Sequence, residues 1–203
     1  MDKPHRISDH FAETHGLLIR SASTLGFKNE QELLGYLKGK VVLDLGSGGG
    51  GFAKQAYEKL GHGTTIVSMN PRLADRNFLD LHQQEGKLFH FDPQAVEKYT
   101  QTAVAADWRH LPFAEESFDS IFATGSFLFY QGTYSDEVMT ALIHLLKKST
   151  GELRIELNLN GNNQEIEMAI KKAKQLGCSV RKDSIEDEMT MAGDYLVIKR
   201  NDT

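Results

Sequence analysis

Two hydrophobic periodicities alternate along the chain. Short apolar runs bounded by glycine predict buried strands, and longer stretches with apolar residues three and four positions apart predict amphipathic helices. Strands are expected at residues 41–45, 64–69, 103–106, 118–124, 152–159, 179–185 and 195–200. Helices are expected at residues 9–25, 30–38, 50–60, 72–82, 135–148 and 163–176, with a short extra helix after Pro93.

The order of these elements predicts the fold class. Strands and helices alternate as far as the fifth strand, which is typical of a parallel sheet with helices on both faces. The last two strands follow each other directly and predict a hairpin. We therefore expect an α/β fold: a doubly wound, mostly parallel seven-stranded sheet with an antiparallel terminal hairpin. With 203 residues, a single domain is expected, in which residues 1–39 form an N-terminal helical cover and residues 40–203 a Rossmann-like core.

The stretch at residues 41–52, which reads VVLDLGSGGGGF, predicts a binding site. Its apolar run is typical of a buried parallel strand, and a helix-like run follows the glycines. Glycines permit positive φ angles and let a ligand lie against bare backbone. The start of the helix offers free N–H groups and the positive end of the helix dipole. We interpret this stretch as a strand, a tight turn and a helix that hold a nucleotide-like ligand.

Composition narrows the function classes. The net charge of −5 gives no general attraction for nucleic acid or anionic membranes. Cys178 is the one cysteine, so an intramolecular disulfide and a multi-cysteine metal site are excluded, and no metal site is predicted. No segment approaches the roughly 20 apolar residues of a membrane span, and the N-terminus lacks the apolar core of a signal peptide. A cytoplasmic protein with neither nucleic-acid nor membrane partners is expected.

Further motifs distinguish between possible nucleotide-like ligands. The glycines alone also satisfy the dinucleotide pattern G-x-G-x-x-G. However, Asp44 ends the first strand and Asp107 follows the third, and Leu-Pro-Phe at 111–113 precedes a Phe-Asp at 118–119. In residues 42–52 and 106–126, and in its order of strands, the chain resembles the class I S-adenosylmethionine-dependent methyltransferases.

The resemblance implies S-adenosylmethionine as the cofactor and a set of residues that bind it. These are Asp44, Gly46, Ser47, Gly48, Gly50, Asn70, Asp107, Trp108 and Thr124. Asp44 would shape the turn or reach the cofactor's amino group. Asp107 would accept a hydrogen bond from the adenine amino group, and Trp108 would lie against the adenine face. Thr124, together with Gly125 and Ser126, would line the floor near the sulfonium.

One position departs from the family pattern. The second strand usually ends in an acid that accepts hydrogen bonds from both ribose hydroxyls, whereas this chain has Asn70 there. An amide offers one acceptor oxygen and no charge, so it can hold one hydroxyl. The same departure disfavours NAD, which also prefers an acid at this place.

The methyl acceptor and the catalytic base stay open. No Asn-Pro-Pro-Tyr motif follows the fourth strand, so methylation of DNA base amino groups is disfavoured. A small molecule or a protein side chain is expected as the acceptor. Candidate bases are His10 and His15 on the N-terminal cover, and Tyr130 and Tyr134 after the fourth strand. Two alternatives remain: a binding protein of the same fold without turnover, and a less favoured NAD-dependent oxidoreductase.

Overall fold

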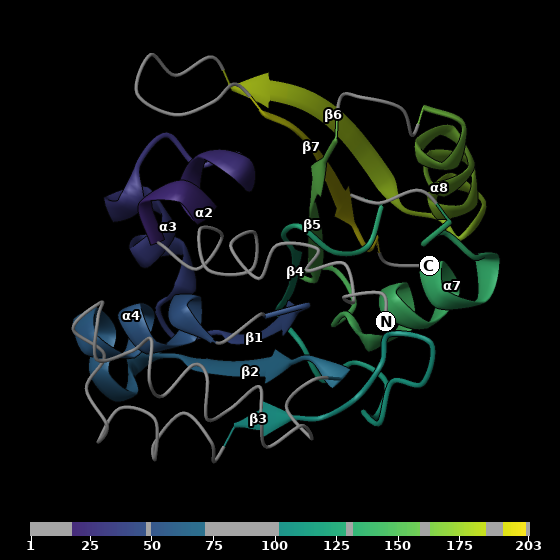
Figure 1. The fold of residues 1–203 in the computed structure, drawn as a ribbon. Helices are drawn as coiled ribbons and strands as arrows, with labels where there is room; N and C mark the ends of the chain where they lie inside the picture. The colour runs from purple at the N-terminus through teal and green to yellow at the C-terminus, as the bar shows by residue number, and fades with distance from the viewer. Residues whose placement is uncertain are drawn as a thin grey trace, which may run out of the picture.

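The structure, a computed structural model, describes residues 18–47, 50–71, 102–128, 132–158, 163–185 and 193–201 (Figure 1). Its strands are β1 (Val41–Leu45), β2 (Thr65–Met69), β3 (Ala103–Val104), β4 (Ser120–Ala123), β5 (Glu152–Leu157), β6 (Ser179–Ile185) and β7 (Gly193–Lys199). Its helices are α2 (Leu18–Thr24), α3 (Glu30–Leu37), α4 (Gly51–Leu60), α7 (Asp136–Leu145) and α8 (Asn163–Gln175), with a 3-10 turn η1 (Gly61–Gly63). The predicted helices at 72–82 and after Pro93 lie outside the described residues.

The strands form one seven-stranded sheet in the order β3-β2-β1-β4-β5-β7-β6. The first five in this order run parallel, and β7 pairs antiparallel with both β5 and β6. The predicted α/β fold with its terminal hairpin is therefore confirmed. The fourth strand is shorter than predicted, because Phe118 forms an isolated bridge with Leu146 instead of continuing the ladder.

Alternate residues of the strands build two cores on opposite faces of the sheet. One core lies under α7 and α8 and includes Leu43 of β1 and Leu153 of β5. The other lies under α2, α3 and α4 and includes Val42 and the aromatic ring of Phe122. Figure 1 shows α2, α3 and α4 on one side of the sheet and α7 and α8 on the other. Burial on both faces explains why the central strands read as continuous apolar runs.

The helices begin where the sequence provides capping side chains. Asn29 Oδ1 accepts a hydrogen bond from the main-chain amide of Glu32 (2.9 Å), and Glu32 Oε2 accepts one from the amide of Lys28 (2.7 Å). Ser135 caps α7 in the same way, through the amide of Val138 (3.1 Å). Side-chain caps satisfy N–H groups that the first helical turn leaves without partners. Within the described ranges, none of these helices combines the length and the apolar character needed to cross a bilayer.

Candidate functional site

The parallel strands bring most of the predicted cofactor residues to one edge of the sheet. Because β1, β2, β3 and β4 run parallel, their carboxyl ends meet at the same edge. Gly46 follows β1, Asn70 follows β2, Asp107 lies beyond β3, and Thr124 follows β4. Open α/β sheets bind ligands at this edge. The predicted residue Gly48 lies outside the described residues.

The turn after β1 is held by the main chain of β2. The amides of Gly46 and Ser47 both donate to the carbonyl oxygen of Met69, at 2.8 and 3.1 Å. Gly46 and Gly50 each have a φ angle of +81°, and Gly50 is the N-cap of α4. A Cβ at Gly46 would lie 2.4 Å from Cβ of Ser126. Glycine at position 46 is therefore required by both its conformation and the close approach of the neighbouring turn.

Asp44 is buried beneath this turn with an acceptor that no described residue uses. Its side chain is 3% exposed, and its Oδ2 has no hydrogen-bond partner among the described residues. Burial raises the pKa of Asp44 to about 7. The hydroxyls of Ser47 and Ser68 are likewise buried without a partner within this part of the chain, and Ser68 pairs in register with Asp44. Since buried polar groups are nearly always hydrogen-bonded, these three groups fit a polar ligand at the loop.

Asp107 and Trp108 lie beyond β3 at the same edge. Arg109 donates to Asp107 from its main-chain amide and from Nε (both 2.9 Å), and also from Nη2. These hydrogen bonds lower the pKa of Asp107, so its carboxylate is ionised at neutral pH. A carboxylate has about four acceptor positions, so one remains for a ligand donor. Trp108 is half-buried and packs against the core under α7 and α8.

The turn after β4 packs directly against the glycine loop. Ser126 is 4% exposed, and its Oγ donates to the carbonyl oxygen of Leu45 at 2.7 Å. This hydrogen bond fixes Ser126 against the end of β1, and its expected place in the floor near the sulfonium stays a prediction. Thr124 is half-buried beside it. The amide of Asn70 donates to the carbonyl of Val104 at 3.2 Å, which fixes the end of β2. The ligand contacts of Thr124 and Asn70 stay predictions.

The structure does not favour Tyr134 as a base. Its hydroxyl donates to Asp136 Oδ1 and lies 3.3 Å from the carbonyl oxygen of Met168. Burial, together with the Asp136 carboxylate, raises the pKa of Tyr134 above its ordinary value. A tyrosine in this environment holds its proton more tightly than usual. The other candidate bases, His10, His15 and Tyr130, lie outside the described residues.

Glu156 is a residue of this edge that the sequence analysis did not identify. It is the second-to-last residue of β5, and its Oε2 accepts a hydrogen bond from the amide of Gly125 at 2.8 Å. The signal was present in the sequence, because charged residues occupy every second position of ELRIEL, a strand expected to be buried on both faces. Buried charges of this kind are retained only with partners.

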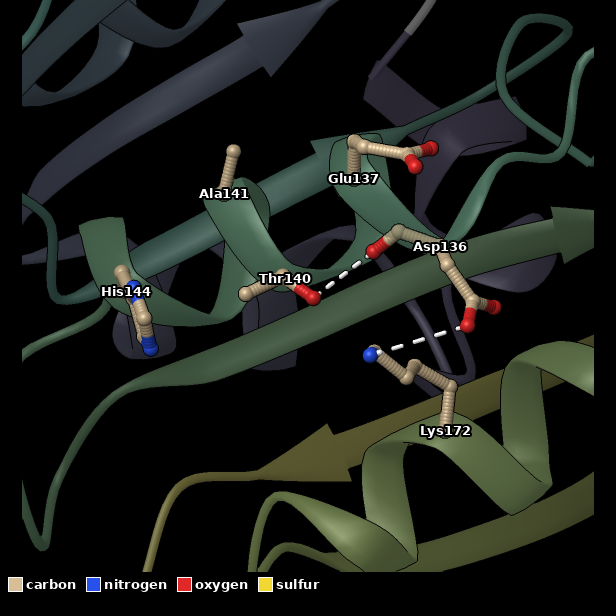
Figure 2. Close-up of a pocket in the computed structure, with 6 residues that line it drawn as sticks. All are labelled: Asp136, Glu137, Thr140, Ala141, His144 and Lys172. Atoms are coloured by element: carbon tan, nitrogen blue, oxygen red, sulfur yellow. Dashed lines mark hydrogen bonds and ion pairs between the residues drawn. The ribbon is translucent and has the colours of Figure 1, made fainter.

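An open hollow lies between α7 and α8 (Figure 2). It is lined by Asp136, Glu137, Thr140, Ala141, His144 and Lys172. Lys172 Nζ lies 3.6 Å from Asp136 Oδ2, and Thr140 Oγ1 donates to the carbonyl oxygen of Asp136 at 2.7 Å. No predicted cofactor residue that the structure describes lines it. Across the described ranges, no group of three His, Cys, Asp or Glu residues could hold a metal ion.

Known proteins share this architecture. The sequence family described as "Methyltransferase domain" matches residues 43–151, more than half of the chain. No curated protein matches the sequence. Magnesium protoporphyrin IX methyltransferase (ChlM) from Synechocystis PCC 6803, solved with bound SAM, has a TM-score of 0.58 and 16% identity, over 95% of this chain and 85% of that one.

Two further solved structures resemble the chain. A SAM-dependent methyltransferase from Aquifex aeolicus has a TM-score of 0.56 and 15% identity, over 92% of this chain and 96% of that one. The cyclase SpnF has a TM-score of 0.55 and 12% identity, over 95% of this chain and 96% of that one. At these identities the likeness shows the fold alone. The presence of a cyclase among the three illustrates that a fold does not fix the reaction.

Proposed function

Since the chain belongs to the methyltransferase domain family, we propose that it transfers a methyl group from S-adenosylmethionine to a small molecule or a protein side chain. The predicted family resemblance is confirmed by this membership. The observation that carries the proposal is the buried Oδ2 of Asp44, which has no partner in the described part of the chain and lies beneath a glycine turn with positive φ. A ligand with donor groups that lies along bare backbone satisfies both features.

The residues present at the carboxyl edge fit the cofactor's chemistry. Asp44 and Ser47 would serve its amino-acid portion, because they offer buried acceptors at the glycine loop. Asp107, ionised and with one acceptor position left by Arg109, would accept from the adenine amino group. Trp108 would lie against the adenine ring, and Asn70 would hold one ribose hydroxyl.

The chain contributes positioning rather than covalent chemistry. When bound, S-adenosylmethionine supplies an electrophilic methyl group on its sulfonium. Main-chain hydrogen bonds hold the start of the glycine turn, and the Ser126 hydroxyl and the Glu156 carboxylate hold the turn after β4, so the edge is organised before a ligand arrives. Holding reactants in line accounts for a large part of the rate of such displacements. A base is required only for an acceptor that must lose a proton, and Tyr134 is not suited to that role.

A ligand titration tests this proposal. Trp108 is the one tryptophan of the chain, so its intrinsic fluorescence reports directly on the predicted adenine site. We expect saturable quenching with S-adenosylmethionine and with S-adenosylhomocysteine, and none with NAD, with calorimetry as an independent measurement. Binding of NAD alone would overturn the proposal in favour of an oxidoreductase. Binding of both sulfur ligands without methyl transfer to any acceptor tested would support the alternative of a binding protein.

A further inference from the structure

Glu156 lies where the sheet meets the candidate cofactor site. It is 7% exposed and projects from β5 on the same face of the sheet as Arg154 and Glu152. Arg154 and Glu152 form a hydrogen-bonded ion pair within the strand. Glu156 instead accepts a hydrogen bond from the amide of Gly125 at 2.8 Å. Gly125 has a φ angle of +54° and begins the turn after β4. The carboxylate therefore holds a turn in a conformation that other residues rarely adopt.

The turn at residues 125–126 also supports the glycine loop. Ser126, the residue after Gly125, donates from Oγ to the carbonyl oxygen of Leu45 at 2.7 Å. Its Cβ also occupies the space beside Gly46, where an added Cβ would meet it at 2.4 Å. The main chain of Gly46 is fixed on its other side by Met69. A continuous series of contacts thus runs from Glu156 through the turn to the first residue of the glycine loop.

From these contacts we propose that Glu156 is a positioning residue: its carboxylate locks the turn at residues 125–126 against the glycine loop and thereby sets the affinity for the cofactor. This rests on the proposed function, since the glycine loop is taken to hold S-adenosylmethionine. Glu156 acts through Gly125 and Ser126 and need not touch the ligand. Residues that fix the binding groups raise affinity by removing the cost of ordering them on binding.

The test compares two substitutions at Glu156 with a control in the same strand. Glu156→Gln keeps a side-chain oxygen that can accept from Gly125, and Glu156→Ala removes it. Glu152→Ala is the matched control, because Glu152 is a buried glutamate on the same face of β5 whose partners are Arg154 and Lys199. Affinity for S-adenosylhomocysteine is measured by Trp108 fluorescence and calorimetry, and stability by urea denaturation.

We expect Glu156→Ala to weaken binding about 10- to 100-fold, because it leaves the amide of Gly125 without its acceptor, and Glu156→Gln to stay within about threefold of wild type, because its side-chain oxygen still accepts. Glu152→Ala should lower the denaturation midpoint while its dissociation constant changes less than about threefold. If Glu156→Ala binds as wild type does, or if Glu152→Ala loses as much affinity, the inference is wrong. If wild type itself binds no S-adenosylhomocysteine, the proposed function fails, and the inference fails with it.

A second substitution keeps the inference testable if Glu156→Ala does not fold. Ser126→Ala removes the hydroxyl that reaches Leu45 and should weaken binding about 2- to 10-fold. Because Glu156→Gln keeps the acceptor for Gly125, Ser126→Ala combined with Glu156→Gln should stay within about threefold of Ser126→Ala alone. A combined loss well above that of Ser126→Ala would show that the charge of Glu156, and not its hydrogen bond, matters, and would overturn the positioning role.

Discussion

The two ends of the sheet differ in how completely their polar groups are paired: at the carboxyl end Glu156 and Ser126 have partners, but three other buried polar atoms have none among the described residues. At the amino end, Tyr36 and Ser120 share a hydrogen bond of 2.7 Å between their hydroxyls. Asp119 accepts from the amide of Val41 (2.9 Å) and from Lys147 Nζ (2.9 and 3.0 Å). At the carboxyl end, Asp44 Oδ2 and the hydroxyls of two serines, Ser47 and Ser68, are buried with no partner among the described residues.

This difference in pairing distinguishes polar groups that stabilise the fold from polar groups available to a ligand. Paired groups at the amino end stabilise the fold and specify how the helices dock, because each desolvated group recovers its hydrogen bonds within the chain. Unpaired groups at the carboxyl end cost stability in the ligand-free protein. That cost is offset if a ligand supplies the missing partners, so the end of the sheet with unpaired polar groups is the end that we propose to bind the cofactor. The predictions below test this contrast.

The largest effect is expected for Arg154, which anchors α2 and α3 to the sheet. It is buried, bonds to Glu152, and donates from Nη1 to the carbonyl oxygen of Leu25 at 2.6 Å. Its guanidinium also lies 4.0 Å from the ring centre of Phe27. Arg154→Met leaves Glu152 without its buried partner and should lower the free energy of unfolding by about 3–5 kcal/mol in urea denaturation.

The chain offers a matched control for Arg154. Arg181 of β6 pairs in register with Val197, as Arg154 does from the other side, but Arg181 is exposed. Arg181→Met should change the unfolding free energy by less than about 1 kcal/mol. Equal effects of the two substitutions would show that the buried contacts of Arg154 add nothing to the stability of the fold. A specific loss at Arg154, with earlier proteolysis of residues 18–40, would support the proposal that the N-terminal helices form a docked cover.

Much of the architecture was predictable because the periodicity of the sequence is strong. Parallel strands that are buried on both faces appear in the sequence as apolar runs. The glycines after β1 indicate a turn whose backbone needs positive φ angles. The links between distant segments were not predictable. Glu156 reaches Gly125 across 31 residues and Arg154 reaches Leu25 across 129, and neither separation has a local signature. Tyr134 shows the opposite case, a local contact: its hydroxyl donates a hydrogen bond to Asp136, two residues away, and its predicted role as a base is not favoured by that contact.

The second prediction concerns pH, because the pKa values of Asp44, at the carboxyl end, and Asp119, at the amino end, shift in opposite directions. Burial raises the pKa of Asp44 to about 7 from an ordinary value of 3.8. In wild type, the unfolded state therefore loses its proton first, and folding stability falls as pH rises from about 4 to 7, by up to about 4 kcal/mol. Asp44→Asn should abolish this fall. The folding stability of the variant relative to wild type should therefore increase from about pH 4 to 7 and stay constant above about pH 7.

At the amino end, the pKa of Asp119 shifts in the opposite direction, so its effect on stability has the opposite dependence on pH. Burial alone would raise the pKa of its carboxyl, but the hydrogen bonds from Val41 and Lys147 outweigh burial and lower it. Asp119 therefore stabilises the fold above its unfolded pKa, and this contribution is lost as pH falls through the lowered value. Asp119→Asn should be less stable than wild type at pH 7 and converge with it in acid. Urea denaturation between pH 3 and 8 measures both variants, and parallel curves for Asp44→Asn and wild type would contradict the assignment.

The smallest expected effect separates two glycines with the same backbone conformation. Gly46, at the carboxyl end, and Gly39, after α3, have φ angles of +81° and +76°. A Cβ at Gly39 would meet nothing within 4 Å, whereas a Cβ at Gly46 would meet Ser126 at 2.4 Å. Both alanine variants therefore carry the same backbone strain, about 1 kcal/mol, and only Gly46→Ala adds a clash of roughly 1–3 kcal/mol.

We expect Gly46→Ala to lose about 3 kcal/mol of unfolding free energy and at least tenfold in affinity for S-adenosylhomocysteine, since Ser126 must move away from the glycine loop. Gly39→Ala should lose about 1 kcal/mol and bind the ligand as wild type does. Because the two variants share their backbone strain, the difference between them measures the close approach of the two turns alone. If both variants lose stability equally and neither loses affinity, the contact between Ser126 and the glycine loop does not shape the binding site. Ligand affinity at the carboxyl end of the sheet would then depend on other contacts.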